Sequence, residues 1–288
     1  MKQLIKDVLA QIDYSLYYLK IKRNRIRVYT VEDTIRELTC SEKSMVRFGD
    51  GEIMAIAGKS LKLQKVRPEI AEGLKRILGY EYDGMIVTIP EIFGDMSLYR
   101  KESRQFWKEH LLFYRRIYYQ YCNSDKVYYS TSFSRFYYAL ADKEVCKAWA
   151  EQIRQIWKDK DVVVVEGERT HNGVGNNLLD TARSIERIIG PASDAYDRLN
   201  EILDCCRAYS RDRLFLISLG IAAKFIAERL FLEGYRVLDI GNLDVEYEWY
   251  LCRAKDKAVI AKHEAIGEEA NRKAGYEEYL AQIKYQVS

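Results

Sequence analysis

The sequence of 288 residues has little proline, little excess charge and no long apolar run. Three prolines leave no room for a proline-rich linker. No stretch of about eighteen consecutive apolar residues occurs, so a membrane-spanning helix is not expected. Lys and Arg number 46 against 43 Asp and Glu, a net charge of +3. Proteins that bind nucleic acid usually concentrate basic residues far more strongly, so no nucleic-acid partner is expected.

Cysteine and histidine offer no familiar catalytic or metal-binding arrangement. The six cysteines form no C-x-x-C pair, and no Cys/His cluster has zinc-ligand spacing. No signal peptide is recognisable, so we expect reduced thiols in a cytoplasmic protein. No Ser/His/Asp or Cys/His arrangement supports nucleophilic hydrolysis. Of the three histidines, His110 and His263 are expected at a surface or interface, and His171 is either a diphosphate contact or a spectator.

The composition is that of a globular protein, with 48% apolar and 31% charged residues. Residues 2–18 carry Leu4, Val8, Ile12 and Leu16 at helical spacing, which predicts an amphipathic helix. A basic stretch follows over residues 20–27. It is either a solvated helix end leading to a strand, or a contact for an anionic membrane surface or a partner.

We expect residues 1–30 to form an N-terminal extension and residues 31–288 one domain. Peripheral membrane association and homo-oligomers are both left open.

Short apolar segments alternate with helical patterns along the rest of the chain. The segment 213–240 reads as strand, helix and strand, a βαβ unit whose crossover is right-handed in nearly all proteins. Repeated alternation of this kind predicts the α/β class: a Rossmann-like, mainly parallel sheet with helices on both faces. The predicted strands are 44–48, 85–89, 126–130, 161–165, 213–218 and 235–240. The predicted helices are 31–38, 68–78, 97–121, 143–158 and 221–233.

The first chemical motif, Arg-Phe-Gly-Asp-Gly-Glu over residues 47–52, ends a predicted strand. Gly49 and Gly51 allow a sharp turn and a close approach of the backbone to a ligand. Asp50 and Glu52 are hard oxygen ligands, suited to Mg²⁺ or Mn²⁺ bound together with substrate phosphates. Arg47 adds a guanidinium that can hold a phosphate or a carboxylate. The alternative is an ordinary turn with solvated acids.

The second motif is the polar loop 166–177, which follows the most apolar strand. Ligands of parallel sheets lie beyond the carboxyl ends of the strands, where this loop is expected. Its glycines and amides can offer N–H groups to phosphates, ribose or a base. It is not a G-x-G-x-x-G fingerprint, because Leu178 stands at the last glycine position. The candidate donor-binding residues of this loop are Glu166, Gly173, Gly175, Asn176 and Asn177.

The third motif, residues 241–249, again follows a strand and adds Asn242 as a donor-binding candidate. If the segment is extended, Asp244, Glu246 and Glu248 point to one side; if it is helical, Asp244 and Glu248 share a face. Crowded carboxylates can include a general base with a raised pKa, and Glu248 or Glu246 is the preferred candidate. The alternative is a charged helix start.

These three ordered motifs together resemble the GT-D type glycosyltransferase family, long catalogued as a domain of unknown function. The likeness runs from about Val46 to Trp249. Members occur in bacterial clusters that glycosylate serine-rich adhesins or build surface polysaccharides. The family usually has Asp at the position of Asn177, His at that of Asn242, and a Gly-Pro-Thr-Ala-like turn at residues 220–223. Those differences bear on which donor sugar and which acceptor the protein uses, and on its level of activity.

The resemblance implies a Rossmann-like fold and a metal-dependent hexosyltransferase. Asp50 and Glu52 would hold Mn²⁺ or Mg²⁺ and the diphosphate of the donor, which we expect to be a UDP-hexose such as UDP-glucose. The expected acceptor is a saccharide on a glycoprotein or on a lipid-carried polysaccharide precursor. Two alternatives remain at this point. One is a catalytically silent partner in a glycosylation complex, and the other is a Rossmann-type nucleotide-dependent oxidoreductase.

Overall fold

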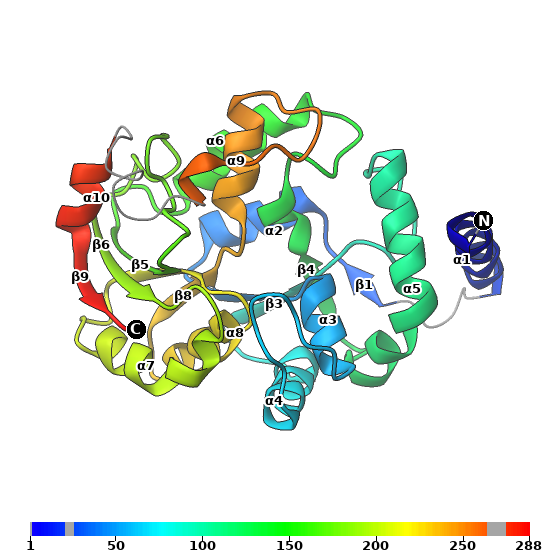
Figure 1. Cartoon of the computed structure of the whole chain (residues 1–288), viewed down its shortest axis with the longest axis horizontal. Coiled ribbons are helices and arrows are strands. Elements are labelled where there is room, and N and C mark those ends of the chain that lie inside the picture. Colours follow the sequence, from blue (N-terminus) through cyan, green and yellow to red (C-terminus); the bar gives the residue numbers. More distant parts are fainter. Residues whose placement is uncertain (1, 21–25, 264–274) are drawn as a thin grey trace.

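A computed structural model describes residues 2–20, 26–263 and 275–288, and a single sheet of nine strands forms its centre (Figure 1). Every adjacent pair of strands is parallel. The predicted α/β class and the βαβ unit near the C-terminus are therefore confirmed. In spatial order the strands are β1 (Arg27–Val28), β4 (Val127–Ser130), β3 (Met85–Ile89), β2 (Ser44–Arg47), β8 (Arg236–Asp239), β7 (Leu214–Ser218), β5 (Asp161–Gly167), β6 (Ser184–Gly190) and β9 (Ile283–Gln286).

Helices cover both faces of the sheet, as predicted (Figure 1). The first face carries α3 (Asp50–Ile56), α4 (Pro68–Gly79), α5 (Lys101–Tyr121), α7 (Leu199–Arg207) and α8 (Ala222–Leu232). The second face carries α2 (Val31–Cys40), α6 (Val145–Gln155) and α9 (Leu243–Leu251). The remaining helices are α1 (Lys2–Lys20), α10 (Tyr276–Gln282) and the short 3₁₀ helices η1 (Thr131–Arg135), η2 (Ala195–Arg198) and η3 (Ala261–His263).

The apolar strands supply a separate core on each face of the sheet. Along β5, Val163 and Val165 pack into the core of the first face, whereas Val162 and Val164 pack into the core of the second. Successive side chains of a strand point to opposite faces, so a strand buried on both sides reads as a continuous apolar run. This is why the run of valines was recognisable as a central strand from sequence alone.

Some elements were not predicted from the sequence. Strand β6 was missed because it contains the charged residues Glu186 and Arg187. Helices α3 and α7 and the edge strand β9 were missed as well. The turn expected at Asp50 and Glu52 is instead the first turn of α3. Helix α5 begins at Lys101, four residues later than expected. All six cysteines lie within the described residues and are free thiols.

The N-terminal helix α1 packs on α5 mainly through polar groups and extends from one side of the molecule (Figure 1). Arg115 on α5, for example, pairs with Asp13 at 2.6 Å. The opposite side of α1 is apolar, and each of its large side chains is at least half exposed. These are Leu4, Ile5, Val8, Leu9, Ile12 and Leu16.

The role predicted for the basic segment rests mostly on residues 21–25, which lie outside the described residues. Membrane contact and oligomer formation through the N-terminal extension therefore stay predictions, as does the domain division at residue 30. Residues 27–28 already belong to the sheet, as β1. Across the described ranges, no helix combines the length and the hydrophobicity that crossing a membrane requires.

A buried ion cluster joins the two halves of the chain where β2 and β8 lie side by side. Lys224 on α8 is only 1% exposed, and its ammonium lies 2.8 Å from Glu52 Oε1 and 3.0 Å from Asp239 Oδ2. Asp239, the last residue of β8, also accepts a hydrogen bond from the backbone N–H of Arg47 at the end of β2. Burial disfavours the charged ammonium, but the two carboxylates outweigh this effect and raise the pKa of Lys224.

Glu52 also fixes the start of α3. Its Oε2 accepts a hydrogen bond of 2.7 Å from the backbone N–H of Gly49, the residue that precedes the helix. Burial of this carboxylate opposes its ionisation, yet Lys224 and Arg47 lower the pKa of Glu52 to about 2. Both oxygens of Glu52 are therefore occupied by protein groups, and the side chain holds β2, α3 and α8 together.

Replacing Lys224 by methionine should destabilise the fold strongly. In Lys224→Met the carboxylates of Glu52 and Asp239 stay buried without their cation, a loss that typically costs about 3–5 kcal/mol. Denaturant titration would measure the free energy of unfolding. Lys147→Met is the matched control, because Lys147 is exposed on α6 and its replacement should change stability by no more than about 0.5 kcal/mol. Equal stabilities of the two variants would contradict a structural role for Lys224.

Candidate active site

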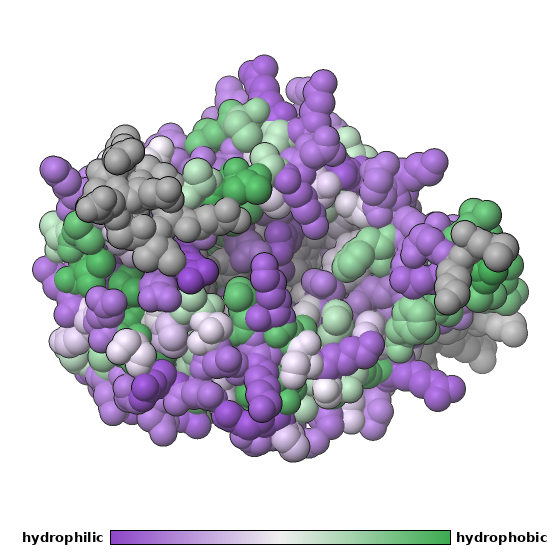
Figure 2. All heavy atoms as spheres, in the orientation of Figure 1, coloured by the Kyte–Doolittle hydropathy of each residue, from purple (hydrophilic) through white to green (hydrophobic). Residues whose placement is uncertain are grey.

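A cavity of about 390 Å³ opens at the carboxyl edge of the sheet. The end of β2, the start of α3, the start of α5, η1 and one residue of α9 form its walls. In Figure 2 the surface is hollowed near the middle of the view, between the α5 side and the α9 side of the molecule. Positive and negative groups both line the cavity. The charged lining residues are Arg47, Asp50, Arg100, Glu102, Arg135, Glu246 and Lys257.

Arg47 is held at this cavity with unused hydrogen-bonding capacity. The residue is only 9% exposed, and its buried Nε has no hydrogen-bond partner among the described residues. Gly241, in the left-handed region with φ of 51°, passes directly beside it. A Cβ added to Gly241 would lie 3.1 Å from Arg47 Cδ, so glycine is needed there for both backbone and packing reasons. A buried guanidinium with an unused N–H donor is suited to an anionic ligand.

Asp50 and Arg135 complete the charged end of the cavity. Asp50 is the first residue of α3, and in the described part of the chain its carboxylate takes part in no hydrogen bond or ion pair. Burial and the nearby guanidinium of Arg47 lower the pKa of Arg135. Two guanidinium groups that repel each other gain from an anion placed between them. The end therefore offers one free carboxylate and two cationic groups.

Glu246 is the acidic residue of the third motif that lines this cavity. Its carboxylate is buried, and Oε2 accepts hydrogen bonds from the backbone N–H groups of Tyr137 at 3.1 Å and Tyr138 at 2.8 Å. Its Oε1 lies 3.4 Å from Arg135 Nη1. These contacts fix the position of the carboxylate in the cavity wall.

The other two acids, Asp244 and Glu248, point to a different cluster. The segment is helical, so the expectation that they share a face in the helical case is confirmed. Lys262 Nζ lies 2.7 Å from a carboxylate oxygen of each. Asn176 donates to both, and the backbone N–H of Gly173 donates to Asp244. The two acids do not line the cavity; they attach the polar loop to α9.

The polar loop is itself internally bonded. Glu166 is fully buried and forms an ion pair of 2.5 Å with Arg187 on β6. It also accepts hydrogen bonds from the backbone and the side chain of Asn172. Asn177 accepts a hydrogen bond of 2.7 Å from the hydroxyl of Tyr247. These contacts give the loop a fixed shape at the carboxyl end of β5.

The predicted site residues thus divide into three groups. Of that set, Arg47, Gly49, Asp50 and Glu246 line the cavity. Glu52 and Gly51 lie behind them on α3, and Asn242 is exposed just beyond β8. The remaining ones belong to the loop and to its cluster with α9, on the same edge of the sheet but outside the cavity lining: Asp244, Glu248, Glu166, Gly173, Gly175, Asn176 and Asn177.

The expectations for the histidines were partly wrong. His110 is buried in the first face, where its Nε2 and the hydroxyl of Tyr118 are 3.1 Å apart, and it is not a surface residue. His171 is buried against the carbonyl of Lys262, at 2.6 Å, and does not line the cavity. His263 lies 2.8 Å from Asp244.

Sequence reasoning missed Arg135, Arg100 and the aromatic residues at the start of α5. Arg100 and the aromatic residues fall in a long helical stretch that looks like an ordinary amphipathic helix, and Arg135 falls between a predicted strand and a predicted helix, where no motif marks it. Only the packing of α5 and η1 beside the end of β2 brings these residues to the cavity.

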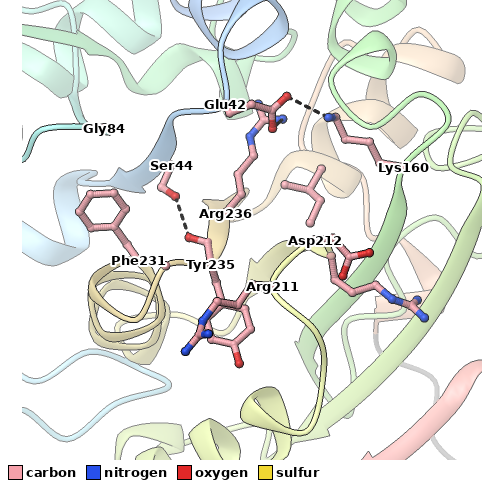
Figure 3. A pocket seen from close by; sticks show the side chains of 12 residues that line it. Glu42, Ser44, Gly84, Lys160, Arg211, Asp212, Phe231, Tyr235 and Arg236 are labelled. Carbon is pink, nitrogen blue, oxygen red and sulfur yellow. Dashed lines mark hydrogen bonds and ion pairs between the residues drawn. The ribbon is translucent and has the colours of Figure 1, made fainter.

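A second cavity, also of about 390 Å³, lies at the amino ends of the strands (Figure 3). Its charged groups are largely paired with protein atoms. Glu42 bridges Lys160 and Arg236, and Arg236 also donates to the carbonyls of Leu38 and Ser41. Since ligands of open α/β sheets bind beyond the carboxyl ends, we assign the functional site to the first cavity.

Metal ligands are sparse around the first cavity. Within the described ranges, no group of three or more His, Cys, Asp or Glu side chains is arranged to hold a metal ion. Asp50 is available, whereas Glu52 is bound by Lys224 and Gly49. One carboxylate is nevertheless compatible with Mg²⁺ or Mn²⁺, which often bind through one or two carboxylates together with substrate phosphates.

Comparison with known proteins agrees with this geometry. Residues 45–268 match the family model described as the glycosyltransferase GT-D fold. The chain is 36% identical over 261 residues to a probable glycosyl transferase, Gly, of Streptococcus gordonii. It is 38% identical over 242 residues to the glycosyltransferase GlyD of Streptococcus pneumoniae serotype 4. These matches cover 90% and 83% of the chain, which spans only 38% and 30% of the two proteins.

Solved structures share the whole architecture. A structure described as a new glycosyltransferase from Streptococcus sanguinis superposes with a TM-score of 0.85 at 35% identity, covering 92% of this chain and all of that one. Another structure, of the domain of unknown function 1792 and described as a distinct glycosyltransferase fold, has a TM-score of 0.85 at 32% identity. It covers 92% of this chain and 97% of its own. The oxidoreductase alternative is therefore not retained: the chain belongs to the GT-D glycosyltransferase family.

Proposed function

We propose that the chain transfers a hexose from a nucleoside-diphosphate sugar, with UDP-glucose as the first donor to test, to a saccharide acceptor. The observation that carries the proposal is the buried guanidinium of Arg47, whose Nε has no hydrogen-bond partner among the described residues, beside Arg135 and the carboxylate of Asp50. The diphosphate of the donor fits there because it supplies acceptor oxygens and negative charge to the two guanidinium groups. The nucleoside then extends along the carboxyl edge toward Asn242 and the polar loop.

A divalent cation, Mn²⁺ or Mg²⁺, is the proposed cofactor. Asp50 would hold it together with oxygens of the diphosphate, and when bound the cation supplies positive charge at the leaving oxygen. Glu52 has a different part in this proposal. Because Lys224 and Gly49 occupy its oxygens, Glu52 positions Asp50 by fixing the first turn of α3.

Glu246 is the proposed general base. Of the three acids on α9, it is the one that lines the cavity with Asp50. Its two backbone hydrogen bonds, from Tyr137 and Tyr138, both go to Oε2. Oε1, whose contact with Arg135 is long at 3.4 Å, is the oxygen assigned to the acceptor hydroxyl.

The acceptor on a glycoprotein or on a lipid-carried polysaccharide precursor, and the cytoplasmic location, are part of the same proposal. The exposed apolar side of α1 supports contact with a membrane surface or with a second copy of the chain. A purified chain that cleaves no sugar from any nucleotide sugar, with or without metal, would favour the silent partner of a glycosylation complex.

Metal binding should depend on Asp50 much more than on Glu52. Titration of Mn²⁺ in the presence of UDP, followed by the electron paramagnetic resonance of free Mn²⁺, measures this directly. Asp50→Asn should weaken Mn²⁺ binding at least about tenfold, since it removes the one charged ligand. Its stability should change little, because the carboxylate forms no hydrogen bond or ion pair with another described residue. Excess chelator should abolish transfer by the wild-type chain.

Glu52→Gln provides the comparison. It should lower the free energy of unfolding by about 1–3 kcal/mol, because Lys224 loses a charged partner, while keeping most of the Mn²⁺ affinity. If Glu52→Gln instead abolishes Mn²⁺ binding and leaves stability unchanged, Glu52 is a metal ligand. Full transfer by metal-stripped protein in chelator would refute the cofactor altogether.

Glu246→Gln should separate binding from transfer. The amide keeps an oxygen for the N–H groups of Tyr137 and Tyr138, so calorimetric titration with UDP should show near-normal affinity. Transfer should fall by ~10²–10⁴-fold, as is typical when a general base is lost. Glu248→Gln is the matched variant on the same helix, outside the cavity lining. If both variants transfer at nearly the wild-type rate, no base lies on this helix; a loss confined to Glu248→Gln would assign the base to Glu248.

A further inference from the structure

The cavity has a second, aromatic end at the start of α5. Phe106 and Trp107 line it there, together with Tyr138 across the opening. Phe106 is 48% exposed. Its ring packs edge-on against Trp107, with ring centroids 5.1 Å apart. The pair offers an adjacent pair of aromatic rings to the cavity.

Polar side chains surround these rings. Ser103 lies one helical turn before both of them and lines the cavity, as does Glu102. The guanidinium of Arg100, the residue before α5, lies 4.0 Å from the ring centroid of Tyr138 and donates to its hydroxyl. Arg100 thus covers Tyr138, which leaves Phe106 and Trp107 as the aromatic surface open to a ligand. Aromatic walls with a few polar groups are typical of sites for small polar molecules with an apolar side.

We infer that Phe106 and Trp107 form the acceptor subsite and bind a sugar ring of the acceptor saccharide. A pyranose ring has C–H groups on its faces and hydroxyls at its edge, so one face stacks on an aromatic ring while the hydroxyls bond polar neighbours. The inference rests on the proposed function, because it assumes that the diphosphate occupies the charged end of the same cavity.

The arrangement of the strands and helices around the cavity favours the acceptor, and not the donor, as the ligand of Phe106 and Trp107. The loops proposed for the nucleoside follow β8 and β5, on one side of β2 in the sheet. Helix α5 follows β3, on the other side of β2, and contacts α1, α3 and α4. Asp50 lies between the two regions, at the end of β2. An acceptor that enters over α5 therefore meets the donor near Asp50 and Glu246, which both line the cavity.

Kinetics of transfer to a saccharide test the subsite. Phe106→Ala should raise the KM for the acceptor about tenfold, with the KM for UDP-glucose changed less than twofold, and Phe106→Tyr should restore the acceptor KM. Phe113→Ala is the matched control, because Phe113 is also an exposed aromatic residue of α5, at 61%, but lies outside the cavity and packs against Lys6 of α1. This variant should behave as the wild type.

Direct binding makes the test independent of turnover. Saturation-transfer NMR with the methyl glycosides of glucose, galactose and N-acetylglucosamine, in the presence of UDP and Mn²⁺, detects a sugar on the wild-type chain. The signal should disappear in Phe106→Ala and persist in Phe113→Ala. If no glycoside binds the wild type, or if Phe106→Ala raises the donor KM instead, the subsite assignment is wrong. Failure of the wild type to bind UDP or cleave UDP-glucose would be a failure of the proposed function itself.

Discussion

An ammonium group removed from water needs compensating charge close by, and this requirement governs the centre of the molecule. Lys224 meets it through Glu52 and Asp239, which belong to segments far apart in the sequence. Satisfying one buried cation therefore fixes α8, the start of α3 and the end of β8 relative to one another. Asp50 is the first residue of α3, and Arg47, the last residue of β2, donates its backbone N–H to Asp239. The charged end of the cavity takes its shape from this cluster.

The carboxylates at the carboxyl edge have the same chemistry but different surroundings. Glu52 and Asp244 each contact a buried lysine and Glu166 contacts Arg187, whereas Asp50 is the one of these four that forms no hydrogen bond or ion pair with another described residue. Of these four, the acids that already contact a cation chiefly hold the structure together, and Asp50 is the one available to a ligand. The sequence alone does not reveal this difference, because the D-x-E pattern of Asp50 and Glu52 suggests two equivalent metal ligands.

Much of the fold could be predicted from sequence, because buried strands appear as continuous apolar runs and amphipathic helices as apolar residues at helical spacing. The run at residues 162–165 is an example. Strand β6 could not be predicted in the same way, since Arg187 looks exposed until its partner Glu166 is placed beside it from another strand. Four residues of the predicted set line the candidate cavity: Arg47, Gly49, Asp50 and Glu246. Phe106, Trp107 and Arg135 depend on how α5 and η1 pack, which local patterns do not reveal.

The central cluster also has a consequence for how the protein is made. The residues that meet at the β2 and β8 ends, Arg47 and Asp239, are 192 positions apart in the sequence. At 5–20 residues per second, a ribosome needs roughly 10 to 40 s to bridge that interval. Until Lys224 is made, Glu52 lacks its buried cation, and until β8 is made the edge of β2 that pairs with it has no neighbouring strand. The first 200 residues are therefore not expected to form a separately folded unit.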